Sequence, residues 1–287
     1  MPSAPPSLAG QQVFGAAHTQ TKLEMLESYL PAFTTALQSR FRLHYVDAFA
    51  GTGDCYLKVP EGRLRVPGSA SLAIDCTPRF HKLAFIEKSP WRCRALERLK
   101  QRHPAREVLV IRDDANVALP DYIRSLDKWK DRAVIFLDPF GMHVEWRTLQ
   151  TIAASKIPDV WYLFPLFGLY RQASRNAAAI DADKWGALTK LLGTEEWRDA
   201  FYERRRQESL FGDTPDVRHA DVPEMLAWVK KRLQTIFAAV AEPKVLHQMT
   251  KSGKRGAPMF ALFFLVSNPS PPAMGLALRI ANSILRA

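Results

Sequence analysis

The segment LHYVDAFAGTGD at residues 43–54 carries the strongest indication of the fold. It starts as a short apolar run with β-branched and aromatic residues, reaches an acid at Asp47, and enters a loop of small residues that includes Gly51 and Gly53. A buried strand that ends on a carboxylate and breaks into glycines is typical of a nucleotide-type pocket, because glycine lets the backbone approach a ligand closely. The spacing differs from the G-x-G-x-x-G of dinucleotide enzymes and from the phosphate-loop lysine motif. The alternative is a tight turn between strand and helix that binds no ligand.

The same stretch resembles motif I of the Rossmann-like methyltransferases that use S-adenosylmethionine (SAM). The resemblance implies that the strand-end acid and the loop after it face the methionine end of the cofactor. The residues concerned are Asp47, Phe49, Ala50, Gly51, Thr52 and Gly53.

The composition is that of an ordinary globular protein, with 47% hydrophobic and 24% charged residues over 287 positions. This length favours one α/β core with an added lobe, so residues 18–287 are expected to form one domain after a flexible tail at residues 1–17. No apolar run reaches the roughly 18 residues that a membrane helix needs. Three cysteines without a C-x-x-C pair favour the reducing cytoplasm over a disulfide framework or a metal site.

The formal net charge is +11, which favours a polyanionic partner, usually DNA or RNA, through attraction to phosphate. The alternative is a basic surface that serves solubility alone.

Five apolar runs, at residues 43–46, 83–86, 108–111, 133–137 and 160–164, alternate with helical patterns. Apolar strands joined by crossover helices predict a parallel sheet that is covered on both faces. Right-handed crossovers place all the strand ends at one edge, where ligands bind. Four acids fall at these ends: Asp47, Glu87, Asp114 and Asp138.

Two of these acids are expected to hold the adenosine part of a nucleotide-type cofactor. Glu87 can accept hydrogen bonds from both ribose hydroxyls, unless it is a surface acid that pairs with Lys88 or an arginine. Asp114, preferred here to Asp113, can accept from the adenine amine, although either acid could instead cap the next helix. The other expected cofactor contacts are Ser69, which is also expected to cap a helix at residues 69–76, and Lys88, Ala115 and Asn116.

The remaining segments surround this core. Residues 18–40 predict an amphipathic helix that Pro31 kinks or divides, with a polar entry, including Lys22, that can fold over the cofactor. Residues 56–67 read as a basic, irregular insert. Residues 167–221 break the alternation and predict an inserted helical lobe that covers the strand ends and carries substrate. Helices are also expected at residues 90–102, from 116 towards 129, and at 145–154, 223–240 and 273–285.

The runs at residues 244–249 and 259–266 flank a basic glycine turn and predict an antiparallel hairpin. A closing hairpin after five parallel strands is the order of the SAM-methyltransferase fold, which predicts a seven-stranded, mostly parallel sheet. The basic residues expected to contact substrate are Lys22, Arg171, Arg175, Lys251, Lys254 and Arg255.

With these segments, the chain resembles the three-Cys-motif partner family, a group of SAM-methyltransferase-like proteins. The matching motifs are HTQTKLEMLESYL at residues 18–30, DAFAGTG at 47–53, PGS at 67–69, FIEK at 85–88, DDAN at 113–116 and DPFG at 138–141. The resemblance implies the fold, SAM as cofactor, a radical-SAM-like protein with three cysteines as a partner, and a bacterial defence or mobile-element context.

Asp138-Pro139-Phe140 stands where amino-methyltransferases place the motif D/N-P-P-Y/F. In those enzymes the carboxylate and a proline carbonyl accept hydrogen bonds from an amine, and an aromatic ring stacks on the base, which contributes about 1–3 kcal/mol. Here Phe140 replaces the second proline and Gly141 the aromatic residue, so the ring comes one position early. His143 is a candidate proton acceptor, because its ordinary pKa is near 6.5, although a single histidine in a loop is more often structural.

These observations favour a SAM-dependent methyltransferase that acts on nucleic acid. The amino group of a base is one candidate acceptor, and the displaced aromatic ring at Phe140 counts against it. Two alternatives stay open at this point. One is a methyltransferase-like partner protein that holds SAM or RNA without catalysis, and the other is a methyltransferase that acts on protein.

Overall fold

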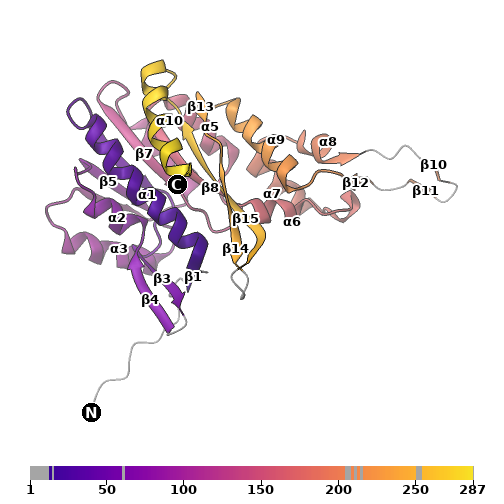
Figure 1. The fold of residues 1–287 in the computed structure, drawn as a ribbon, viewed down its shortest axis with the longest axis horizontal. Helices are drawn as coiled ribbons and strands as arrows, with labels where there is room; N and C mark the ends of the chain where they lie inside the picture. The colour runs from indigo at the N-terminus through magenta and orange to yellow at the C-terminus, as the bar shows by residue number, and fades with distance from the viewer. Residues whose placement is uncertain are drawn as a thin grey trace, which may run out of the picture.

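The structure is a computed structural model that describes residues 13–14, 16–59, 62–203, 208–209, 212–213, 216–249 and 254–286. At its centre the strands lie in the order β6, β5, β2, β7, β8 and β15, with β14 and β13 both paired to β15 (Figure 1). Their bounds are β2 (Arg42–Asp47), β5 (Lys82–Ile86), β6 (Val108–Ile111), β7 (Asp131–Leu137), β8 (Pro158–Phe164), β13 (Ala239–Val240), β14 (Lys244–Met249) and β15 (Arg255–Val266).

The first five strands are parallel, whereas β15 runs antiparallel to β8 and forms the predicted closing hairpin with β14. This is the strand order of the Rossmann-like SAM-methyltransferases, so the predicted fold class is confirmed. The short strand β13 is an addition that pairs with the last two residues of β15.

Alternate residues of each central strand face two different hydrophobic layers. Val160 and Tyr162 of β8 belong to one cluster, whereas Trp161 and Leu163 belong to the other, because successive side chains of a strand point to opposite faces. One layer contains α1 (Ala16–Leu37), α2 (Ser69–Asp75), α3 (Pro90–Arg102) and α10 (Pro271–Arg286). The other contains α4 (Ala115–Arg124), α5 (Trp146–Ser155) and α9 (Val222–Gln234), together with the inserted lobe.

Helix α1 begins two residues earlier than predicted and continues through Pro31, which therefore does not divide it. Leu26, Leu30 and Phe33 are buried on both sides of the proline, and their packing outweighs the single lost backbone hydrogen bond. The described part of the predicted tail also contains β1 (Val13–Phe14), which pairs with β3 (Asp54–Val59). The rest of residues 1–17, except for the first turn of α1, lies outside the described residues.

The prediction of an irregular insert at residues 56–67 is wrong. The segment forms an antiparallel hairpin of β3 and β4 (Gly62–Pro67), in which Val59 is opposite Gly62. Apolar and basic residues alternate along LKV and RLRV, which is the period-two pattern of a strand. The high charge of the segment hid this signal.

Two predicted helices end early. Helix α4 ends at Arg124, short of Trp129, and α9 ends at Gln234, short of Val240. Residues 239–240 instead join the edge of β15 as β13, because pairing with an open strand edge competes with further helix. Among the described residues, no helix is long and apolar enough to span a membrane.

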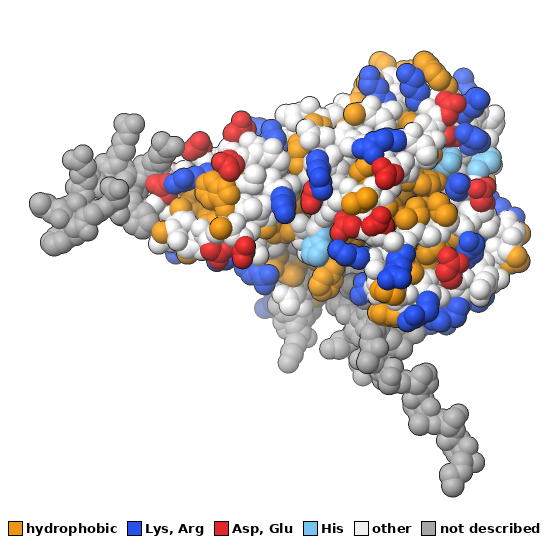
Figure 2. Space-filling view, turned by 180° about the vertical axis from the view of Figure 1, so that it is seen from behind, with side chains coloured by type: hydrophobic (Ala, Val, Ile, Leu, Met, Phe, Trp, Pro, Cys, Tyr) orange, Lys and Arg blue, Asp and Glu red, His pale blue; other side chains and the backbone are white. Residues whose placement is uncertain are grey.

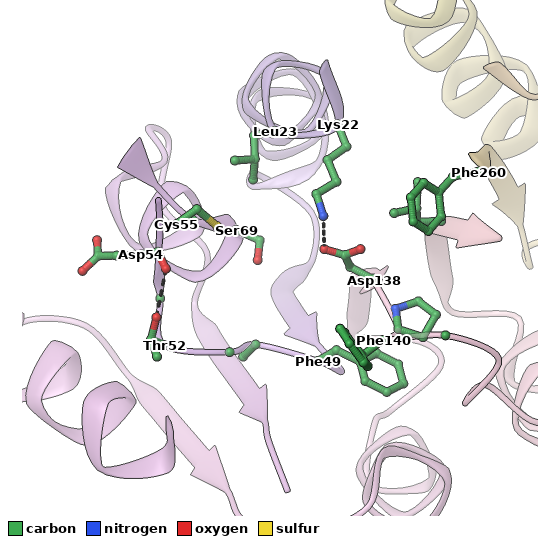
Figure 3. A pocket seen from close by; sticks show the side chains of 17 residues that line it. Lys22, Leu23, Phe49, Thr52, Asp54, Cys55, Ser69, Asp138, Phe140 and Phe260 are labelled. Atoms are coloured by element: carbon green, nitrogen blue, oxygen red, sulfur yellow. Dashed lines mark hydrogen bonds and ion pairs between the residues drawn. The ribbon is translucent and has the colours of Figure 1, made fainter. Parts of the chain in front are cut away.

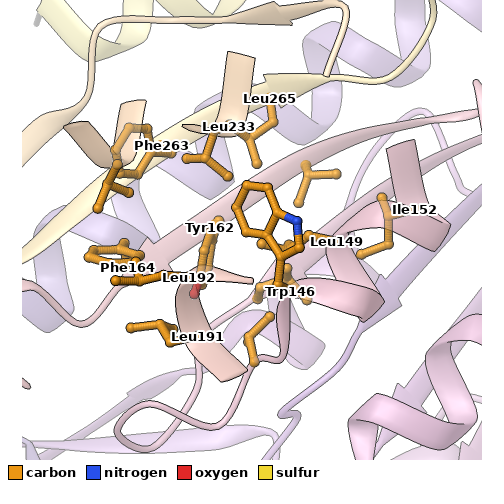
Figure 4. Packing of buried hydrophobic residues seen from close by; sticks show 14 of the residues in the cluster. Trp146, Leu149, Ile152, Tyr162, Phe164, Leu191, Leu192, Leu233, Phe263 and Leu265 are labelled. Atoms are coloured by element: carbon orange, nitrogen blue, oxygen red, sulfur yellow. The ribbon is translucent and has the colours of Figure 1, made fainter. Parts of the chain in front are cut away.

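The inserted lobe packs on the flank of the core. Its elements are α6 (Leu166–Gln172), the 3₁₀ helix η1 (Ala177–Ala179), α7 (Ala182–Leu192), α8 (Trp197–Phe201), and the short strands β9 (Tyr202–Glu203), β10 (Glu208–Ser209), β11 (Gly212–Asp213) and β12 (Val217–Arg218). Figure 1 shows it extending sideways from the sheet beside α9. Leu191 and Leu192 join the cluster around Trp146 and Tyr162 (Figure 4), so the lobe shares the main core.

Candidate functional site

Two cavities lie side by side at the carboxyl ends of the parallel strands and share Phe49, Asp138 and Phe140. The first, here called the loop cavity, has a volume of about 200 Å³ and is shown in Figure 3. Its walls are residues 49–55, the start of α1, the start of α2, and residues 138–141. The second, the acid cavity, has a volume of about 420 Å³ and is lined by Glu87, Lys88, Arg92, Asp113, Asp114 and His143 among others. Because they share three residues, the two cavities adjoin, and together they are called the cleft below.

Asp47 lies beneath the glycine loop and lines neither cavity, which differs from the predicted direct contact with cofactor. Its Oδ1 accepts from the Phe49 backbone N–H at 3.2 Å, and its Oδ2 accepts from the Ser69 hydroxyl at 2.5 Å. The carboxyl therefore ties the loop to the start of α2. Ser69 does line the loop cavity, but it is not the predicted helix cap, because Gly68 holds that position and Ser69 donates to Asp47 instead.

Burial raises the pKa of Asp47 to about 7, against the hydrogen bonds from Ser69 and Phe49 that lower it. Between about pH 4 and 7 the folded protein keeps this proton while the unfolded chain loses it, so stability falls as pH rises through this window. The shift from 3.8 to about 7 sets an upper bound of about 4 kcal/mol on the total loss.

We expect Asp47→Asn to lose less stability than the wild type between pH 5 and pH 8, by about 2 kcal/mol. Urea unfolding of both proteins at the two pH values measures this difference. Burial also raises the pKa of Asp159 to about 7 and lowers the pKa of His44. Both residues are present in the two proteins, so their contributions to the pH dependence of stability cancel in the comparison. Equal pH dependence in the two proteins contradicts the assignment.

The glycines of the loop are required by backbone conformation and close packing. Gly51 and Gly53 have φ angles of +62° and +84°. A Cβ atom on Gly53 would lie 2.6 Å from the Leu99 side chain of α3, and one on Gly68 would lie 2.7 Å from the Gly53 carbonyl oxygen. Close packing at the start of α2 and against α3 therefore explains why residues 53 and 68 are glycines. The loop that contains Gly51 and Gly53 lines the loop cavity.

Glu87 lines the acid cavity and also holds the loops around it. Its Oε2 accepts from the Gly51 backbone N–H at 3.1 Å, and its Oε1 accepts from the Ser89 N–H at 2.8 Å. The predicted alternative partner Lys88 pairs with Asp114 instead, whereas an Arg92 nitrogen lies 3.6 Å from Oε2. A carboxylate has about four acceptor sites, so Glu87 keeps capacity for ribose hydroxyls.

Asp114 caps α4 by accepting from the Asn116 backbone N–H at 2.9 Å and still lines the acid cavity with Ala115. Burial favours its neutral form, but the hydrogen bonds from Asn116 and Lys88 outweigh this effect and lower its pKa. Asn116 lines neither cavity. Its amide bridges to the His143 carbonyl oxygen at 2.8 Å and accepts from the Glu145 N–H at 3.0 Å, so it positions the loop after β7.

Asp138 and Lys22 form an ion pair in the middle of the loop cavity (Figure 3). The Lys22 side chain is only 4% exposed and the Asp138 side chain 22% exposed, so the ammonium donates to the carboxylate in a largely enclosed space. Phe140 is 78% exposed and stands beside Phe49 where the two cavities meet. Of the other predicted catalytic residues, Pro139 lines the loop cavity and His143 the acid cavity.

Most of the predicted substrate-binding residues lie elsewhere. Arg171, Arg175, Lys254 and Arg255 line neither cavity, and Lys251 lies outside the described residues. No described residue of the inserted lobe lines the cleft, which differs from the expected position of the lobe over the strand ends.

Several lining residues escaped sequence analysis: Leu23, Asp54, Cys55, Ser89, Arg92, Leu163 and Phe260. Leu163 and Phe260 read as ordinary strand core, and no pattern distinguishes a core residue that also borders a cavity. Arg92 carried a usable signal, because it lies in the first turn of the helix after Glu87. Burial raises the pKa of Cys55 to about 11, so its thiol stays protonated at neutral pH.

No protein-family model and no curated protein matches the chain. Among solved structures it is similar to the protein LPL1258 from Legionella pneumophila, of the family DUF519, with a TM-score of 0.52 and 13% identity over 94% of this chain and 93% of that one. It is also similar to the N-terminal domain of EvdMO1 with SAH bound (TM-score 0.39, 14% identity, 84% and 80% covered). A third is the putative methyltransferase yhhF from Escherichia coli (TM-score 0.33, 11% identity, 50% and 69% covered).

At such identities a structural likeness shows the fold alone, and the two lower TM-scores carry no argument. The Legionella protein matches over nearly the whole length of both chains. The strand order described above defines the class as a Rossmann-like methyltransferase fold. Membership of the three-Cys-motif partner family is not shown by these comparisons.

Proposed function

We propose that the protein is a SAM-dependent methyltransferase that acts on nucleic acid. The observation that carries the proposal is the pair of adjoining cavities lined by Glu87, Asp114 and Asp138, which come from three different strand ends. These acids are 51 positions apart from first to last, and the parallel sheet brings them to one edge.

The residues of the cleft fit SAM. Glu87 has acceptor capacity left for ribose hydroxyls, and Asp114 borders the same cavity, where its carboxylate can accept from the adenine amine. The loop cavity then takes the methionine end, where the partly enclosed Lys22 suits a carboxylate. When bound, SAM supplies an electrophilic methyl group on sulfur.

The chain itself would bind and orient the acceptor. The Asp138 carboxylate can accept a hydrogen bond from an amine and so direct the nitrogen lone pair. For this, Lys22 must release the carboxylate or leave one of its oxygens free for the amine. Phe140 is exposed at the junction of the cavities and can stack on a flat base. Asp138 and His143 both line the cleft beside Phe140, and either can accept the proton that the amine loses.

The nucleic-acid part of the proposal is supported by the net charge of +11 and by the exposed ring of Phe140. Figure 2 shows Lys and Arg side chains spread among acidic and apolar ones over one face, without a single basic patch. Dispersed cations still attract phosphate, and the binding they produce weakens steeply with salt. A protein substrate would show much weaker dependence on salt.

Calorimetry with SAH, the demethylated product of SAM, tests the cofactor site. We expect wild-type binding, and binding about 30-fold weaker or worse in Glu87→Ala, because a hydrogen bond to a charged group contributes about 1.5–3 kcal/mol. Glu97→Ala is the matched control, since Glu97 is an exposed acid on α3 whose nearest cation lies 3.9 Å away. Absence of SAH binding in the folded wild type, or equal binding in Glu87→Ala, contradicts the proposal.

The Lys22–Asp138 ion pair favours a second candidate, a protein that binds SAM without turnover, because the carboxylate that should receive the acceptor already has a cation. Transfer of radiolabelled methyl groups to mixed cellular DNA and RNA separates the two. Label on nucleic acid supports catalysis, whereas SAH binding without label on DNA, RNA or protein supports the second candidate. Label on protein alone identifies a protein methyltransferase.

A further inference from the structure

A third cavity lies at the opposite edge of the sheet, between α1 and α10, and has a volume of about 420 Å³. We call it the far cavity. Arg132 and Asp159 border it near the amino ends of β7 and β8, and Asp138 follows Arg132 by six residues of strand, which is about 20 Å. Its size falls in the range of small-molecule sites, and it shares no lining residue with the cleft described above.

The floor of the far cavity is apolar except for one carboxyl group. Tyr29 and Phe33 from α1 and Ile157 before β8 are buried there. The Tyr29 hydroxyl donates to Oδ2 of Asp159 at 2.7 Å, whereas Oδ1 of Asp159 has no donor among the residues that the structure describes. Burial raises the pKa of this carboxyl to about 7, although Tyr29 and Arg132 both lower it. An acceptor with spare capacity in an apolar cavity favours a ligand that brings N–H or O–H donors.

The rim of the far cavity is cationic and aromatic. Arg40 is exposed there, and Trp129 is 77% exposed. The Arg132 guanidinium lies 4.1 Å from the centre of the Phe41 ring, and it donates to the carbonyl oxygens of Lys128 at 2.8 Å and Asp131 at 2.6 Å. The far cavity therefore has a positive charge and flat aromatic surfaces in its lining, together with the carboxyl group.

These features select among ligand classes. A purely apolar ligand would leave the Asp159 oxygen without a donor, and a cationic amine would be repelled by Arg40 and Arg132 at the entrance. The ligand class that fits is a flat ring with two N–H donors on one edge and an anion at the other end. The donors can meet Asp159 at the floor, the ring can lie beside Trp129, and the anion can meet the arginines of the rim. Guanine presents such an edge through N1–H and the 2-amino group, and a nucleotide adds the phosphate.

We propose that the far cavity binds a guanine nucleotide, with the base edge on Asp159, the ring beside Trp129, and the phosphate near Arg40 and Arg132. The nucleotide can be free or part of a strand, because both present the same groups. This inference does not depend on the methyltransferase proposal, since it uses none of the residues of the cleft.

Calorimetry with guanosine monophosphate tests the proposal on the full chain. We expect the wild type to bind guanosine monophosphate and Asp159→Asn to bind it at least tenfold more weakly. The wild type should bind adenosine monophosphate at least tenfold more weakly than guanosine monophosphate, and inosine monophosphate, which lacks the 2-amino group, severalfold more weakly. Asp121→Asn, at an exposed acid of α4 that pairs only with Arg124 among the described residues, is the matched control and should bind like the wild type. Thermal unfolding verifies that Asp159→Asn is folded.

The exposed Arg40 provides a second variant that carries little risk to folding. Arg40→Ala should weaken guanosine monophosphate severalfold while leaving guanosine unchanged. Two RNAs of five nucleotides, one with a single central guanine and one with adenine in its place, show whether the ligand is a free nucleotide or part of a strand. Tighter binding of the guanine RNA than of guanosine monophosphate indicates a strand, and the reverse indicates a free nucleotide. No binding of either at millimolar concentration, equal affinity for the adenine compounds, or an unaffected Asp159→Asn overturns the proposal.

Discussion

Asp138→Asn is expected to reduce methyl transfer by a factor of about 100 or more while SAH affinity changes by less than about threefold. The substitution keeps the size of the side chain and one oxygen that Lys22 can contact, but it removes the charge that orients an amine and receives its proton. Because the residue acts on the acceptor, and Glu87 and Asp114 are left intact, cofactor binding should persist. Initial rates of label transfer and SAH calorimetry on the same preparation measure the two quantities.

Asp54→Asn is the matched control for this variant. Asp54 lines the same loop cavity, its side chain is 23% exposed against 22% for Asp138, and it pairs with an arginine, Arg65. The two variants therefore remove the same charge from similar surroundings, and we expect Asp54→Asn to keep activity within about threefold. Full activity in Asp138→Asn, or a parallel loss of SAH binding, contradicts the assigned role.

Gly193→Ala is expected to destabilise the protein by about 4 kcal/mol. Gly193 ends α7 with a φ angle of +72°, which costs an L-residue about 1–2 kcal/mol. A Cβ atom there would lie 2.1 Å from the Trp146 ring, which packs among Leu149, Leu233 and their neighbours in the core (Figure 4). Overpacking of this kind costs a further 1–3 kcal/mol, roughly.

Gly186→Ala is the control on the same helix. Nothing lies within 4 Å of a Cβ atom built on Gly186, so alanine should stabilise α7 by about 0.5–1 kcal/mol through helix propensity. Urea unfolding of both variants compares the two effects. Similar stability of Gly193→Ala and Gly186→Ala would mean that the end of α7 does not rest on Trp146 and that the lobe is separate from the core.

The sheet was predictable because four of its five parallel strands, β2, β5, β7 and β8, are buried on both faces, and the edge strand β6 is apolar as well. Residues 133–137 and 160–164 are apolar without interruption, and the acids after the strands mark the edge at which they end. Predictions failed where a local pattern was weak or masked. The hairpin at β3 and β4 was hidden by its charge, and the end of α9 depended on the free edge of β15, which is distant in the sequence.

The candidate site, like the fold, was predictable in part. The class of fold, the edge that carries the cleft, and the acids Glu87, Asp114 and Asp138 were predictable from the residues alone, because alternating strands and helices constrain the order of strand ends along one edge. The contacts of each acid became visible only in the folded chain. Asp47 lies beneath the loop and contacts Ser69, Lys22 pairs with Asp138, and the lobe packs beside the core. Each of these contacts joins segments that are distant in the sequence, and their approach depends on packing across the whole fold.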